Sequence, residues 1–84
     1  MLSRKHIELA RSALKSLYGT KGGIELICVV HNEAIFLTHI PPNRHFGKRR
    51  YKYAVVNRCV WDGATFVISH HSSDYLKENN IMYA

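Results

Sequence analysis

The chain has 84 residues and a mass of 9.7 kDa, which allows one hydrophobic core and excludes a second, so residues 1–84 are expected to form a single domain. Hydrophobic residues make up 46% of the chain and charged residues 21%, a composition that excludes a disordered protein. Twelve Lys and Arg against six Asp and Glu give a formal net charge of +6, which favours an anionic partner.

The cellular compartment is predicted from hydropathy and cysteine usage. No apolar stretch approaches the length of a membrane span or of a signal peptide. Cys28 and Cys59 each stand in an apolar run, and a small secreted domain would normally need more disulfides than the single one that they could form. We therefore expect a cytoplasmic protein with no membrane partner and with two reduced thiols in its core.

Residues 2–18 are predicted to form an amphipathic helix, with Ser3 capping the first turn and Gly19 ending the last. Its apolar stripe, at spacings of three and four residues, consists of Ile7, Ala10, Leu14 and Leu17. The charged residues of the other face are interpreted as a solvated surface. They are Arg4, Lys5, Glu8, Arg11 and Lys15.

Residues 24–30 and 34–40 are predicted to be two strands of a hairpin, because β-branched and aliphatic residues fill both. A two-residue loop at Asn32 and Glu33 would pair Val30 with Ile35. This register would place six apolar residues on one face of the sheet: Ile24, Leu26, Cys28, Val30, Ile35 and Leu37.

Two prolines at positions 41 and 42 end the second strand, and a polar loop runs from Asn43 to Arg50. Alternating residues then predict a third strand over 51–61 and, after the turn signal Asp62-Gly63, a fourth over 64–70. A two-residue loop there would pair Cys59 with Phe66. A short helix capped by Ser72 or Ser73 is expected to run to about residue 79.

The predicted fold class is therefore α+β. We expect an N-terminal amphipathic helix packed on a four-stranded antiparallel sheet of two hairpins, followed by a short C-terminal helix. Such a sheet leaves at least one edge strand, so a homodimer formed through a sheet edge is an alternative to a monomer.

The strongest functional signal is a cluster of Lys and Arg residues between residues 44 and 58 that contains no Asp or Glu. Arg and Lys can meet phosphates there while the rings of His45 and Phe46 stack on unpaired bases. The candidate binding residues are Arg44, His45, Phe46, Lys48, Arg49, Arg50, Lys52 and Arg58. In the alternative, purely structural interpretation, Tyr51 and Tyr53 face the core, and the Lys and Arg residues only keep the protein soluble.

Three functions fit this pattern. The first is a basic nucleic-acid-binding or regulatory module that contacts RNA or DNA phosphates through the 44–58 loop and strand. The second is a compact inhibitor or adaptor that binds an acidic protein surface, of the type found among accessory proteins of mobile elements. The third is a small metal-independent ribonuclease that uses His45 and His70 as acid and base and Lys48 to hold the phosphate.

Enzyme and metal signals are otherwise weak. The sequence contains no phosphate-binding glycine loop, no HExxH and no GxSxG. Four ligands for zinc are conceivable across neighbouring strands, namely Cys28, His39, Cys59 and His70. Nothing in their spacing specifies such a site, so we expect no metal and no cofactor, and favour a binding protein over an enzyme.

Overall fold

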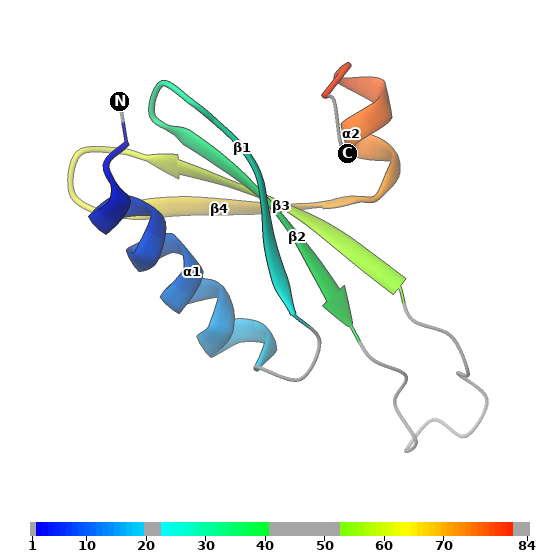
Figure 1. Cartoon of the computed structure of the whole chain (residues 1–84), viewed down its shortest axis with the longest axis horizontal. Coiled ribbons are helices and arrows are strands. Elements are labelled where there is room, and N and C mark those ends of the chain that lie inside the picture. Colours follow the sequence, from blue (N-terminus) through cyan, green and yellow to red (C-terminus); the bar gives the residue numbers. More distant parts are fainter. Residues whose placement is uncertain (1, 20–22, 41–52, 82–84) are drawn as a thin grey trace.

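The computed structural model describes residues 2–19, 23–40 and 53–81. Its elements are helix α1 (Arg4–Tyr18), strands β1 (Ile24–Val30), β2 (Glu33–Ile40), β3 (Tyr53–Trp61) and β4 (Phe66–Ser72), and helix α2 (Asp74–Glu78). The strands form one antiparallel sheet in the order β1-β2-β3-β4 (Figure 1). The predicted α+β fold, with two hairpins between an N-terminal and a short C-terminal helix, is confirmed.

Helix α1 begins and ends at the predicted caps. The Ser3 hydroxyl accepts a hydrogen bond from the His6 backbone N–H, and the His6 ring accepts one from the Ser3 backbone N–H at 3.0 Å. Histidine thus fills the position of a capping box that Glu or Gln usually occupies. At the other end, Gly19 has a φ of 77° and donates its N–H to the Lys15 carbonyl.

The buried stripe of α1 differs from the prediction at its last position. Ala10 and Leu14 are buried and Ile7 packs against the same core, but Leu17 is 60% exposed. Tyr18 takes its place, because the step from Leu14 to Tyr18 is four residues and keeps the side chain over the sheet, whereas Leu17 lies further round the helix.

The turn between β1 and β2 lies one residue earlier than predicted. His31 and Asn32 form it, with His31 at a φ of 51°, and Glu33 is the first residue of β2, opposite Val30. Asn32 is held in this turn by β3. Its side-chain nitrogen donates a hydrogen bond to the Trp61 backbone carbonyl, and its backbone carbonyl accepts one from the Trp61 backbone N–H. This contact joins residues that are far apart in the sequence, so local sequence patterns do not contain it.

The predicted common face of this hairpin is also wrong, because the pairing shifts between Leu26 and Cys28, at a β-bulge. Ile24 and Leu26 therefore pack beneath α1, while Cys28 lies on the opposite face with Ile35 and Leu37. A strand that contains one extra residue changes the face of every side chain beyond it.

The β3–β4 loop contains four residues, not two, so Cys59 pairs with Ile68 and Trp61 pairs with Phe66. The Asp62 carboxylate accepts hydrogen bonds from the backbone N–H groups of Ala64 and Thr65. These two bonds close the turn that contains Gly63. The same two hydrogen bonds lower the pKa of Asp62. The shift is two residues, so the predicted faces of β3 and β4 hold although their pairing does not.

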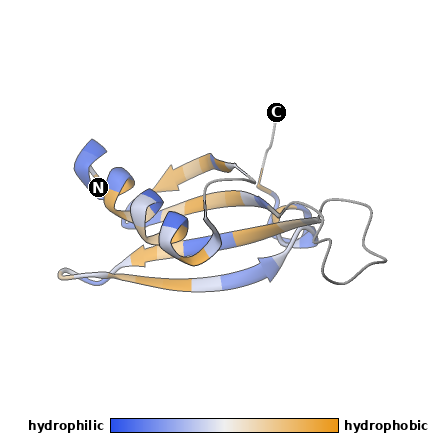
Figure 2. Cartoon of the chain, turned by 90° about the horizontal axis from the view of Figure 1, so that it is seen from below, coloured by the Kyte–Doolittle hydropathy of each residue, from blue (hydrophilic) through white to orange (hydrophobic). Residues whose placement is uncertain are grey.

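The core has two parts, one on each face of the sheet. Under α1, on what we call the α1 face, Ala34, Phe36 and Cys59 pack against Ala10 and Leu14. On the other face, the α2 face, the core consists of Ile35, Leu37, Val56 and Leu76, and Ile81 packs against it. Runs of hydrophobic residues accordingly occur within the strands, between shorter hydrophilic stretches, whereas α1 alternates between hydrophobic and hydrophilic residues (Figure 2).

A polar network on the α1 face joins the end of α1 to the sheet. Asn57 is fully buried, and its amide nitrogen donates to the Thr38 hydroxyl at 2.7 Å. Its amide oxygen lies 2.9 Å from the Tyr18 hydroxyl, which donates to it, and 2.7 Å from Nδ1 of His70. Since an amide oxygen can only accept, the hydrogen of the His70 ring is on Nδ1.

We expect Asn57→Ala to lower the free energy of unfolding by about 2–3 kcal/mol, because it leaves buried polar partners unsatisfied on β2 and α1. Urea denaturation measures this. Thr65→Ala, in the exposed β3–β4 loop, is the control and should change stability little. A loss for Asn57→Ala no larger than that of the control would contradict the role given to the network.

Candidate functional site

Most of the predicted binding cluster lies outside the described residues. Arg44, His45, Phe46, Lys48, Arg49, Arg50 and Lys52 belong to the segment 41–52. The points where this segment leaves and rejoins the sheet are described: Ile40 and Tyr53 are the last pair of β2 and β3. The end of α1 and the start of β1 lie at the same end of the sheet, where the His39 N–H donates to the Gly23 carbonyl (Figure 1).

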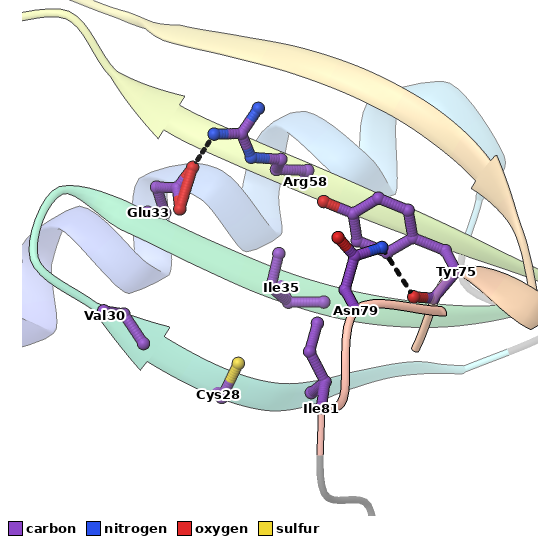
Figure 3. Close-up of a pocket in the computed structure, with 8 residues that line it drawn as sticks. All are labelled: Cys28, Val30, Glu33, Ile35, Arg58, Tyr75, Asn79 and Ile81. Atoms are coloured by element: carbon purple, nitrogen blue, oxygen red, sulfur yellow. Dashed lines mark hydrogen bonds and ion pairs between the residues drawn. The ribbon is translucent and has the colours of Figure 1, made fainter. Parts of the chain in front are cut away.

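Arg58 is the one candidate residue that the structure describes, and it lies apart from that end. It stands five residues from Tyr53 along β3, on the order of 17 Å at the usual rise of an antiparallel strand. Its guanidinium points to the α2 face and forms an ion pair with Glu33 (Figure 3). The Arg58 side chain is 42% exposed and that of Glu33 is 29% exposed, so this pair stays open to solvent.

The Arg58–Glu33 pair forms part of a pocket of about 470 Å³ between the sheet and α2 (Figure 3). Aliphatic side chains supply much of its wall, the Tyr75 ring closes one side, and the polar groups include the ion pair, the Tyr75 hydroxyl and the Asn79 amide. The lining residues are Cys28, Val30, Glu33, Ile35, Arg58, Tyr75, Asn79 and Ile81. We call this the α2-face pocket.

Neighbouring contacts hold the α2 side of this pocket in place. The Tyr75 ring stacks on His71 of β4, with centroids 4.1 Å apart and planes inclined by 25°. Nε2 of His71 in turn lies 2.9 Å from the Ser69 hydroxyl. The Asn79 side-chain nitrogen donates to the Tyr75 carbonyl at 2.9 Å. The aromatic wall is therefore preformed.

The two cysteines are free thiols, as predicted, and lie on opposite faces of the sheet. Cys28 is half-buried in the α2-face pocket, where burial and then the Glu33 carboxylate raise its pKa. Cys59 is fully buried under α1, and burial raises its pKa to about 11. Both sulfurs are protonated at neutral pH, which makes them poor nucleophiles.

The histidines do not form a metal site in the part of the chain that the structure describes. The four conceivable zinc ligands are divided by the sheet, with Cys28 and His39 on the α2 face and Cys59 and His70 on the α1 face. Among residues 2–19, 23–40 and 53–81, no three His, Cys, Asp or Glu side chains are grouped to hold a metal ion.

For the ribonuclease hypothesis, the structure describes only His70. Its Nδ1 is engaged by Asn57 and Tyr18, so Nε2 is the nitrogen that would act as a base. The other two residues of that hypothesis, His45 and Lys48, lie outside the described residues.

The sequence did not reveal the α2-face pocket. Glu33 was assigned to a turn, and Tyr75, Asn79 and Ile81 come from a short helix and the residues after it. These residues reach Arg58 only because α2 folds back over the sheet. No motif or periodicity marks that contact. Glu33 and Arg58 are diagonal neighbours on β2 and β3, since Arg58 pairs with Ile35, and only the correct register brings their opposite charges together.

Comparison with known proteins gives no family for this chain. The sequence matches no family model, and neither a curated protein nor a solved structure shows significant similarity to it. No helix within the described residues is both long and apolar enough to cross a membrane.

The Cys59 thiol is expected to make the fold sensitive to high pH. Its pKa in the folded protein, about 11, exceeds the ordinary 9.0, so above pH 9 the unfolded chain loses this proton more readily. The stability that the neutral thiol contributes is complete below pH 9 and is lost as the pH rises through 11.

This effect is measured by comparing the wild type with Cys59→Ala in urea at several pH values. The difference between their free energies of unfolding should shift against the wild type by about 2–3 kcal/mol between about pH 8 and pH 11. Cys28→Ala, which removes the less buried thiol, should show a smaller shift. A pH-independent difference for Cys59→Ala would refute the assignment.

Proposed function

We propose that the protein is a small, non-enzymatic nucleic-acid-binding module that contacts phosphates through the segment 41–52. The observation that carries this proposal is the distribution of charge. Five of the twelve Lys and Arg residues lie in this segment and none of the six acids does, so the rest of the chain has seven bases and six acids. Nearly all of the net charge therefore belongs to one connection in the fold.

The fold supports this proposal by fixing both ends of that segment. Ile40 and Tyr53 belong to β2 and β3, the two central strands of the sheet, which pair without a shift over eight residue pairs. Loops mounted on a rigid scaffold commonly carry binding residues. In this segment, aromatic residues accompany the Lys and Arg residues, so stacking of nucleobases on these rings can add to the phosphate contacts.

In this proposal Arg58 has a different role from the other candidate residues. Its ion pair with Glu33 offsets its charge, and its position on the α2 face separates it from the ends of the segment 41–52. In our proposal, the phosphate contacts are Arg44, Lys48, Arg49, Arg50 and Lys52. A cytoplasmic location fits this role, because both cysteines are free thiols.

The proposal is tested by the anisotropy of labelled single-stranded RNA, duplex RNA and duplex DNA across a salt series. The triple variant Lys48→Glu, Arg49→Glu, Arg50→Glu should lose nearly all affinity at low salt. For single strands, neutralising the same three residues with Gln should reduce the slope of log K against log salt by about 2.

A second triple variant provides a matched control. Arg4→Glu, Lys5→Glu, Lys15→Glu changes the net charge equally but alters exposed residues of α1. It should retain most of the affinity if the segment 41–52 is the interface. Equal losses in both variants would contradict the proposal, and no binding by the wild type would favour an acidic protein as the partner.

A further inference from the structure

We propose that the α2-face pocket receives an unpaired nucleobase from the strand that the segment 41–52 holds by its phosphates. This inference rests on the proposed function and assigns it a substrate class, single-stranded nucleic acid. In this arrangement the segment 41–52 supplies sequence-independent affinity, and the pocket supplies contacts to a base.

The dimensions and walls of the pocket fit a base. Its volume of about 470 Å³ lies within the range of small-ligand sites, and it holds one base with its sugar but not a folded peptide element. Tyr75 presents an aromatic ring that His71 holds from behind, and Ile35 and Ile81 present aliphatic surface. Such walls accommodate the faces of a flat ring, and proteins commonly bind splayed bases against aromatic side chains.

The polar groups of the pocket suit the edge of a base. Arg58 uses the nitrogen Nη2 for its bond to Glu33, whereas a guanidinium has five N–H donors and a carboxylate about four acceptor positions. The pair therefore presents donors and acceptors side by side, and every nucleobase has both on its Watson–Crick edge.

The charges of this pair select against other ligands. Guanidinium and carboxylate cancel, so the pocket offers little net attraction to a phosphate or to an acidic side chain. The carboxylate would repel either of them at close range. A neutral group with several hydrogen-bonding atoms fits better, and this distinguishes a base from an acidic peptide.

The pocket lies along the strand to which the segment 41–52 connects. Arg58 and Tyr53 lie on the same strand, on the order of 17 Å apart. A few nucleotides of an extended chain span this distance. Val30, at the rim of the pocket, is 54% exposed, so the pocket is accessible from solvent.

The first experiment uses neutral nucleosides, which lack phosphate and therefore report on the pocket alone. Adenosine, cytidine, guanosine and uridine are titrated into the ¹⁵N-labelled full chain, with ribose as the control. We expect at least one nucleoside to shift the backbone amides of Cys28, Ile35, Arg58 and Ile81, and ribose to shift none of them.

The second experiment measures the affinity for a single-stranded oligonucleotide and for an abasic strand of equal length. Glu33→Ala combined with Arg58→Ala removes the hydrogen-bonding groups of both side chains and leaves the net charge unchanged. This double variant should bind the normal strand about tenfold more weakly, the range expected for losing a hydrogen bond to a charged group, and bind the abasic strand as the wild type does.

Two further variants separate blocking of the pocket from loss of stability. Val30→Phe places a ring at the exposed rim and should weaken binding of the normal strand only. Val67→Phe makes the same change at another exposed position of the sheet, 58% exposed and not part of the pocket, and should have no effect. Thermal unfolding verifies that all variants fold.

The outcomes distinguish this inference from the proposed function. If the wild type binds strands with a steep salt slope, but nucleosides shift no pocket amide and abasic strands bind equally well, the base pocket is refuted and the phosphate interface stands. If nucleosides bind in the pocket but no strand binds, the phosphate interface is refuted, and with it the claim that the base belongs to a strand.

Discussion

Burial of β2 on both faces is the constraint on which the rest of this structure depends. Residues 34–38 are each at most 6% exposed, so alternate side chains need cover from opposite directions. The fifteen residues of α1 cover one face along much of the sheet, but α2 has five residues and covers only part of the other. The α2-face pocket lies on the part of this face that α2 does not cover, and Tyr75 and Ile81 form one of its walls.

The sequence predicted the elements well because local signals determine them. The apolar spacing and caps of α1, the aliphatic runs of the strands and the Asp62-Gly63 turn signal are all contained in short segments. The face assignments of β3 and β4 were correct for the same reason, since alternation is a property of each strand.

The register of the strand pairs could not be predicted from local sequence signals. The β1–β2 turn is in contact with β3 through Asn32 and Trp61, residues 29 positions apart, and the bulge near Ile27 has no signature in composition. The candidate site divides along the same line. The basic cluster is a local pattern and was visible in the sequence, whereas the pocket joins β1, β2, β3 and the α2 region and appears only when they are folded together.

The placement of the two cysteines gives the native protein one accessible thiol for chemical labelling within the described residues. Cys59 is enclosed beneath α1, so a thiol-directed label added to the native protein would react at Cys28, on the other side of the sheet. The raised pKa of Cys28 makes this reaction slow at neutral pH, but its half-buried sulfur stands in the wall of the pocket. A fluorophore or spin label can thus be placed at the pocket without introducing a cysteine, and its signal would report directly on what enters there.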